Sequence, residues 1–173
     1  MLYQSNRAFP LSFRFVSFLF IVSFSSSSIL CGSLESTGLA RTLSIGTWTL
    51  FAPTNEAFLK LPAQYVQTLT SNPGVLARLL LFHAVAEEAI YESDLQCSAG
   101  ENLLLMANGK NSRTLCMDTS PGVAVPIYQK GKFNSIDDLP EIVNFDMEAC
   151  NDSVVHRLDG VMLYRPIVTE GSE

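Results

Sequence analysis

The sequence has few of the side chains that enzymes use for chemistry. Charged residues make up only 16% of its 173 residues, and it has two histidines. The patterns G-x-S-x-G, H-E-x-x-H, G-x-G-x-x-G and the phosphate-binding P-loop are all missing from it. Because catalysis needs several converging groups of matched pKa, we expect no enzyme, no catalytic residue and no cofactor.

Positive charge and metal-binding cysteine patterns are also scarce. The chain has 11 basic and 17 acidic residues, which gives a net charge of −6. Affinity for nucleic acid comes largely from Lys and Arg contacts to phosphate, so nucleic acid is not expected as a partner. None of the four cysteines forms a C-x-x-C pair, so no metal site is expected. With 47% hydrophobic residues, the chain is instead typical of a globular protein.

No apolar run near the N-terminus reaches the roughly 20 residues that a membrane-spanning helix needs. Two arginines precede an apolar run of residues 15–24, and four serines follow it. This layout predicts a secretory signal peptide over residues 1–28, with an uncleaved surface anchor as the alternative. The remainder divides into one domain over 29–166 and a short tail over 167–173. We therefore expect a secreted, extracellular protein, associated with the cell surface if the leader is retained.

Secretion sets expectations for the cysteines and for one asparagine. In an oxidising compartment Cys97, Cys116 and Cys150 are candidates for disulfide bonds, although their connectivity stays open and buried reduced thiols are the alternative. Cys31 either lies at the edge of the domain or is lost with the leader, so one thiol is left over unless Cys31 is retained and pairs. Asn151 begins an Asn-Asp-Ser tripeptide, a candidate glycosylation site that has meaning only in a secreted chain.

Helical patterns gather early in the chain and strand patterns gather late. Residues 29–43 suggest a helix broken at Gly38, and two further helices follow Pro53 and Pro62. Asn72 and Pro73 predict the start of another helix, whose apolar face ends at His83. This order predicts an α+β domain. Strands are expected at 48–52, 82–85, 101–107, 112–117, 123–129, 141–145, 154–158 and 161–164, with a hairpin turn at Asn108–Gly109.

Three segments resemble the signature blocks of the fasciclin (FAS1) domain family. They are TLFAPTNEAF at 49–58, LLLFHAV at 79–85, and VVHRLDGVML at 154–163. The second block has Phe82 where the family usually has Tyr, and Asn151–Asp152–Ser153 replaces an Asn-Gly turn before the third. The resemblance implies a fasciclin-like β-sandwich wedge with several helices packed against it. It also implies an adhesion role, with a cell-surface receptor, a matrix protein or a polysaccharide as partner. A third interpretation, a purely structural module of a larger matrix assembly, predicts weak self-association instead.

Most residues of these blocks are interpreted as structural. Thr54 and Asn55 are good helix caps, His156 alternates with its neighbours along a strand and is expected to be half-buried, and Asp159 begins a turn. His83 must find hydrogen-bond partners if it faces the core. The set interpreted as structural is Phe51, Pro53, Thr54, Asn55, His83, His156 and Asp159.

Candidate partner-binding residues come from the resemblance. Phe82 and His83 occupy the positions of a Tyr-His motif that is implicated in integrin binding by animal members, with a core role as the alternative. Asp146 and Met147 precede the third block at the spacing of an Asp-Ile element in adhesion-active members, with an ordinary acidic loop as the alternative. An exposed carboxylate there could engage a receptor-held metal ion, which prefers oxygen ligands.

The alternative function is a soluble carrier of a glycan or small ligand. Bound sugars usually need exposed aromatic side chains beside polar groups, and Tyr91, Tyr128 and Phe133 are available. The segment Tyr128–Gln129–Lys130–Gly131–Lys132 is basic within an acidic chain. It could suit an acidic polysaccharide, although a plain turn is the alternative.

Overall fold

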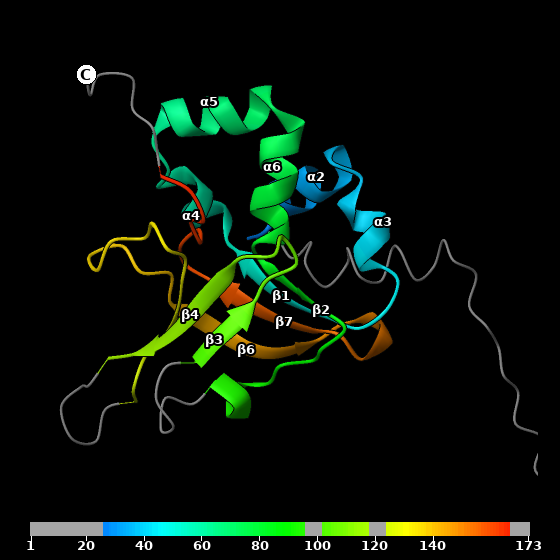
Figure 1. Ribbon diagram of the computed structural model, residues 1–173, viewed down its shortest axis with the longest axis vertical. Coiled ribbons are helices and arrows are strands. Elements are labelled where there is room, and N and C mark those ends of the chain that lie inside the picture. The colour runs from blue at the N-terminus through cyan, green and yellow to red at the C-terminus, as the bar shows by residue number, and fades with distance from the viewer. Residues whose placement is uncertain (1–25, 96–101, 118–123, 167–173) are drawn as a thin grey trace, which may run out of the picture.

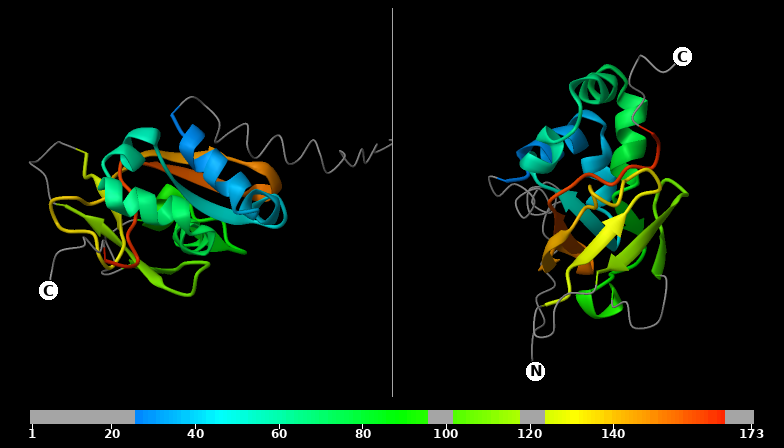
Figure 2. Two further views of the ribbon diagram at one scale, coloured as in Figure 1. Left: turned by 90° about the horizontal axis from the view of Figure 1, so that it is seen from above. Right: turned by 90° about the vertical axis from the view of Figure 1, so that its left-hand side faces the viewer.

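The computed structural model describes residues 26–95, 102–117 and 124–166. Five α-helices occur in these residues: α2 (Ser28–Ser36), α3 (Leu39–Leu43), α4 (Asn55–Leu59), α5 (Ala63–Ser71) and α6 (Pro73–Leu81). Figure 1 shows them gathered above the strands, and Figure 2 shows the same separation from two further sides. The α+β class expected from the sequence is therefore confirmed. No helix of the described residues has the length and apolar character needed to cross a membrane.

A four-stranded sheet forms the centre of the domain. Its order is β2 (Ala84–Ala86), β1 (Trp48–Pro53), β7 (Val154–Leu158) and β6 (Ile142–Glu148). β1 and β7 are parallel, whereas the two outer pairings are antiparallel. The parallel pair sets Phe51 directly beside His156. The first and third sequence blocks are therefore neighbouring strands, although about a hundred residues separate them along the chain.

A three-stranded antiparallel sheet forms a second layer. It contains β3 (Asn102–Leu105), β4 (Asn111–Cys116) and β5 (Ile127–Lys130) in that order. The expected hairpin joins β3 to β4, with Gly109 at a φ of 75° in its turn. Such positive φ angles suit glycine, which has no Cβ. A single bridge between Tyr128 and Glu141 connects this sheet to the neighbourhood of β6.

Two hydrophobic clusters lie on opposite faces of the four-stranded sheet. Along β1, Leu50 and Ala52 belong to a cluster shared with the helices, whereas Phe51 belongs to one shared with the three-stranded sheet. This alternation follows from the two-residue repeat of a strand. The layers are therefore helices, four-stranded sheet and three-stranded sheet, which is the order needed to bury both faces of β1 and β7.

The helix starts follow the capping signals of the sequence. Thr54 accepts a hydrogen bond from the backbone N–H of Ala57 and caps α4, and Asn72 does the same for α6 through Val75. Pro73 occupies the first turn of α6, where its missing N–H costs nothing. One expectation is wrong, because residues 161–164 form no strand. Instead, the backbone of Leu163 bonds to Phe133 and to the side chain of Asn134.

Candidate binding surface at the β6 bulge

Strand β6 is interrupted by a bulge that turns Asp146 outward. Asn144 pairs with Arg157 and Met147 pairs with Val155, so Phe145 and Asp146 together lie opposite His156 alone. Asp146 has a φ of 51°, the left-handed conformation that bulges use for one residue. The bulge changes the direction of the strand locally, and 39% of the Asp146 side chain is exposed.

The carboxylate of Asp146 is held in a fixed position. Its Oδ1 accepts a hydrogen bond of 2.8 Å from the backbone N–H of Glu92, which begins the short 3₁₀ helix η1 (Glu92–Leu95). The backbone nitrogen of Asp146 lies 3.4 Å from Nδ1 of His156, and Oδ1 of Asp146 lies 3.9 Å from the same atom. The loop before β3 and the core beneath the sheet therefore both restrain this residue, while part of its carboxylate faces solvent.

His156 supports the bulge from inside the protein. Its exposed fraction is 0%, its Nε2 donates to the carbonyl of Ile90 at 2.8 Å, and its ring stacks on Phe51 at 5.3 Å between ring centroids. Burial lowers the pKa of His156, against the opposing effects of the Ile90 carbonyl and the Asp146 carboxylate. The expectation of half burial is wrong, because both faces of β7 are covered.

His83 and Phe82 lie in the core. Their exposed fractions are 1% and 0%. His83 donates from Nδ1 to the carbonyl of Leu79 at 2.8 Å and accepts at Nε2 from the backbone N–H of Met162 at 2.9 Å. Phe82 packs against Tyr164. As a correction, neither side chain is available at the surface of the folded domain, so we do not include this pair in the binding surface.

Met147 and Asn151 are placed differently from Asp146. Met147 is half-buried and packs against the cluster shared with the helices. Asn151 has a φ of 58°, and its side-chain amide donates to the carbonyl of Ser44 at 2.9 Å. Asp152 also has a positive φ, so the turn before β7 keeps left-handed residues although it lacks glycine. Glycosylation of Asn151 stays a prediction.

The remaining structural residues join distant segments. Asp159 accepts a hydrogen bond from the backbone N–H of Glu141 at 2.8 Å and lies 3.4 Å from the ammonium of Lys60. Phe51 and Pro53 are buried in β1.

Cys116 is disulfide-bonded. Cys97 lies outside the described residues, so the pairing among Cys97, Cys116 and Cys150 stays a prediction. Residues 1–25 of the expected leader and the 167–173 tail also lie outside them.

Sequence reasoning missed the role of Thr49. This buried hydroxyl donates to the carbonyl of Glu88 and accepts from the backbone N–H of Ile90, both at 2.8 Å. It therefore fixes the segment whose Ile90 carbonyl receives His156. The signal was a Thr inside an otherwise apolar strand, because a buried hydroxyl must find partners.

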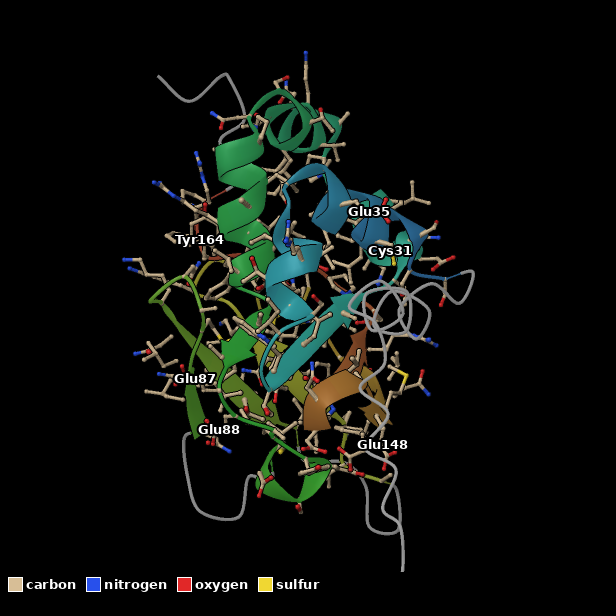
Figure 3. The ribbon with its side chains drawn as sticks, turned by 90° about the vertical axis from the view of Figure 1, so that its right-hand side faces the viewer. Cys31, Glu35, Glu87, Glu88, Glu148 and Tyr164 are labelled. Atoms are coloured by element: carbon tan, nitrogen blue, oxygen red, sulfur yellow. The ribbon has the colours of Figure 1, made fainter. Side chains whose placement is uncertain are left out.

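Acidic side chains near the ends of β6 and β2 do not form a metal site among the described residues. Figure 3 shows Glu148 near the end of β6, across the sheet from Glu87 and Glu88. Among the described residues, no group of three or more His, Cys, Asp or Glu side chains is arranged to hold a metal ion. Asp146 is thus presented singly rather than as a member of a ligand cluster.

The pattern of the fasciclin domain family matches residues 25–164, which include all the described strands. The chain belongs to the fasciclin domain family. In structure it is similar to a FAS1 domain pair from the insect cell adhesion molecule Fasciclin I, with a TM-score of 0.52 and 13% identity over 84% of this chain and 43% of that one. At that identity the likeness establishes the fold alone.

Curated relatives match parts of this fasciclin chain. It is 48% identical over 48 residues to the immunogenic protein MPB70 of Mycobacterium bovis, covering 28% of this chain and 25% of that protein. It is 41% identical over 64 residues to the cell surface glycolipoprotein MPB83 of the same species, covering 36% and 29%. It is 44% identical over 57 residues to the pig transforming growth factor-beta-induced protein ig-h3, covering 32% and 8%. The matches thus span less than a third of each relative.

Proposed function

We propose that this fasciclin domain is a non-catalytic binding module that acts in adhesion at a cell surface or in an extracellular matrix. The observation that carries the proposal is the presentation of Asp146, a partly exposed carboxylate held by a bulge and by the Glu92 amide. Both histidines, the residues best suited to acid–base chemistry near neutral pH, are instead buried and hydrogen-bonded to backbone groups. The names of the relatives, a cell surface glycolipoprotein and a cell adhesion molecule, support the same role.

The contact we infer is electrostatic and directional. A carboxylate oxygen can ligate a divalent cation held by a receptor, or accept hydrogen bonds from an Arg side chain. Because the Glu92 amide and the bulge already orient Asp146, little conformational entropy is lost when a partner binds. Met147 follows on the strand, where its half-buried side chain steadies the bulge against the core.

Asp146→Asn tests this proposal, since the amide retains an oxygen that can accept from Glu92. The measurement is attachment of cells to surfaces coated with the purified domain, with and without a chelator of divalent cations. We expect Asp146→Asn to reduce attachment about tenfold or more, and Met147→Ala to reduce it less. Glu148→Gln is the matched control, because it removes one exposed carboxylate from the same strand. Equal attachment by Asp146→Asn and wild type, with unfolding curves unchanged, would remove Asp146 from the proposal.

A further inference from the structure

Basic side chains gather on the outer face of the three-stranded sheet. Along β4 and β5 the side chains of Ser112, Thr114 and Gln129 are buried. The residues that alternate with them along each strand therefore face outward. Arg113 and Lys130 are among these outward residues and are direct cross-strand neighbours. A hollow of about 410 Å³ lies at this place, lined by Leu103, Asn111, Arg113, Lys130, Gly131 and Lys132.

The register of β4 and β5 places two like charges, Arg113 and Lys130, directly opposite each other. Like charges at directly opposite positions destabilise an antiparallel pair. Here they occur in a chain whose net charge is −6, so basic residues are the scarcer kind. Lys132 adds a third positive charge to the same hollow. An anion placed in the hollow would be attracted by all three cations.

The backbone that carries the two lysines is fixed by close packing. Gly131 lies against the backbone of Leu163, and a Cβ at this position would be 2.6 Å from the Leu163 nitrogen. The buried side chain of Asn134 accepts from the backbone N–H groups of Gly131 and Leu163, at 3.0 and 2.9 Å. Phe133 donates its backbone N–H to the carbonyl of Leu163. The loop is therefore ordered before any ligand arrives, which reduces the entropy lost on binding.

A buried polar network fixes the strands beneath the hollow. Gln129 donates to the hydroxyl of Ser112 and accepts from that of Thr114, both at 2.8 Å, and Ser112 donates to the carbonyl of Lys130. These bonds tie β4 to β5 at the level of Arg113 and Lys130. A fully satisfied buried network of this kind makes the sheet rigid. The spacing of the two cations is thereby set by the fold.

Apolar and aromatic groups border the charges. Phe133 is 40% exposed, and the ammonium of Lys132 lies 5.5 Å from the centre of its ring. Leu103 lines the hollow and is also exposed. A sugar ring has an apolar C–H face and hydroxyl edges, so a surface that mixes an aromatic ring with cations suits charged sugars. An acidic peptide would use the cations but has less need of the exposed ring.

We infer that this hollow binds an anionic polysaccharide. Its carboxylate or sulfate groups contact Arg113, Lys130 and Lys132, and a sugar ring lies near Phe133. The inference rests on the proposed extracellular role, because such polymers are found there, and it assigns a face different from that of Asp146. The Tyr128–Lys132 segment was expected to be basic from the sequence alone. The structure adds Arg113 from another strand and the fixed hollow between them.

The test measures binding of the purified domain to immobilised heparin, polygalacturonate and neutral dextran at increasing salt. We expect binding to one or both polyanions and none to dextran, with affinity falling as salt rises because counterions are released on binding. The triple variant Arg113→Gln, Lys130→Gln, Lys132→Gln is expected to lose about tenfold to a hundredfold in affinity. Phe133→Ala is expected to weaken binding to the sugar polymers and leave binding of poly-glutamate unchanged.

Two controls make the result specific. Arg41→Gln with Arg78→Gln removes exposed charges from α3 and α6, away from the hollow, and is expected to change the affinity less than threefold. Asp146→Asn is expected to bind polyanions as the wild type does. Loss of polyanion binding therefore tests the hollow, whereas loss of cell attachment tests the proposed role of Asp146. The inference is overturned if neither polyanion binds, if the triple variant binds as well as wild type, or if poly-glutamate binds and the polysaccharides do not.

Discussion

The imidazole of His83 accepts a hydrogen bond of 2.9 Å from the backbone N–H of Met162. The carbonyl of the same His83 receives the backbone N–H of Phe51 at 2.8 Å. Phe51 in turn lies beside His156 in the parallel pair of strands. His83 therefore joins the first and third sequence blocks to the end of α6. The three blocks therefore form one connected core around two histidines.

Burial of His83 predicts a loss of stability in mild acid. It lowers the pKa of His83 to about 4 from 6.5. Between these values the unfolded chain takes up a proton that the folded domain does not, so the free energy of unfolding decreases as pH falls from about 6.5 to about 4. When the pH is lowered from about 7.5 to about 5, the titration of His83 should lower the free energy of unfolding by about 2 kcal/mol. Urea unfolding at the two pH values measures the difference.

His83→Gln provides the comparison, because its amide can still donate and accept. At about pH 7.5 we expect the variant to be less stable by about 1–3 kcal/mol, owing to poorer hydrogen-bond geometry in the core. Its further loss on acidification should be smaller than that of the wild type by about 2 kcal/mol. His156 is also buried with a lowered pKa, so some pH dependence will remain. Identical pH dependence in the two proteins would show that His83 does not titrate as described.

Asn55 caps a helix other than the one it begins. Its Oδ1 accepts from the backbone N–H of Ile29 at 3.0 Å, in the first turn of α2, while Thr54 caps α4. We expect Asn55→Ala to lower the free energy of unfolding by about 1 kcal/mol, and Asn55→Asp to cost less because it keeps an acceptor and adds negative charge at the helix start. Urea unfolding measures both variants.

Ser36→Ala is the control for Asn55. Ser36 is exposed at the other end of α2 and donates only to the carbonyl of Ser33 in its own helix. It should change stability by less than about 0.5 kcal/mol. If Asn55→Ala were no more harmful than Ser36→Ala, the bond from α4 to α2 would contribute nothing to the fold.

The parts of this structure that could be predicted from the sequence are those set by residues close together in the chain. The caps at Thr54 and Asn72 and the turn at Gly109 depend on a few neighbouring residues, so the sequence indicates them directly. The family follows from the three blocks. The sequence does not indicate which helix Asn55 caps, because Ile29 is a long way along the chain. The full burial of His156 is hidden for a similar reason, since it depends on two layers that cover β7 from both faces.

In the candidate sites, too, the sequence indicates single residues but not the contacts between distant segments that place them. Asp146 was identified by its position before the third block, but the bulge that exposes it depends on the register between β6 and β7. The basic segment at Tyr128–Lys132 is visible in the sequence, whereas its neighbour Arg113 is placed there by strand pairing. Asn134 had no sequence signal at all. Its importance appears only when its contacts with Gly131 and Leu163 are formed.

Two glycines should respond to alanine in opposite directions. Gly32 is exposed within α2, and a Cβ there would meet nothing within 4 Å. Gly32→Ala should therefore stabilise the domain by up to about 1 kcal/mol, because alanine loses less conformational entropy in a helix. At Gly131 the new Cβ would collide with the carbonyl oxygen and nitrogen of Leu163, which are backbone atoms that cannot move aside cheaply.

Gly131→Ala should accordingly destabilise the domain by about 2 kcal/mol or more, as measured by urea unfolding beside Gly32→Ala. The clash would push the loop away from Leu163 and weaken the bonds that Asn134 makes to both residues. Since that loop positions Lys130 and Lys132, the fraction of Gly131→Ala that folds should also bind polyanions less tightly than wild type. If Gly131→Ala were as stable as the wild type, the close approach of Gly131 to Leu163 would not be a constraint on the fold, and the fixed geometry of the basic hollow would lose its physical basis.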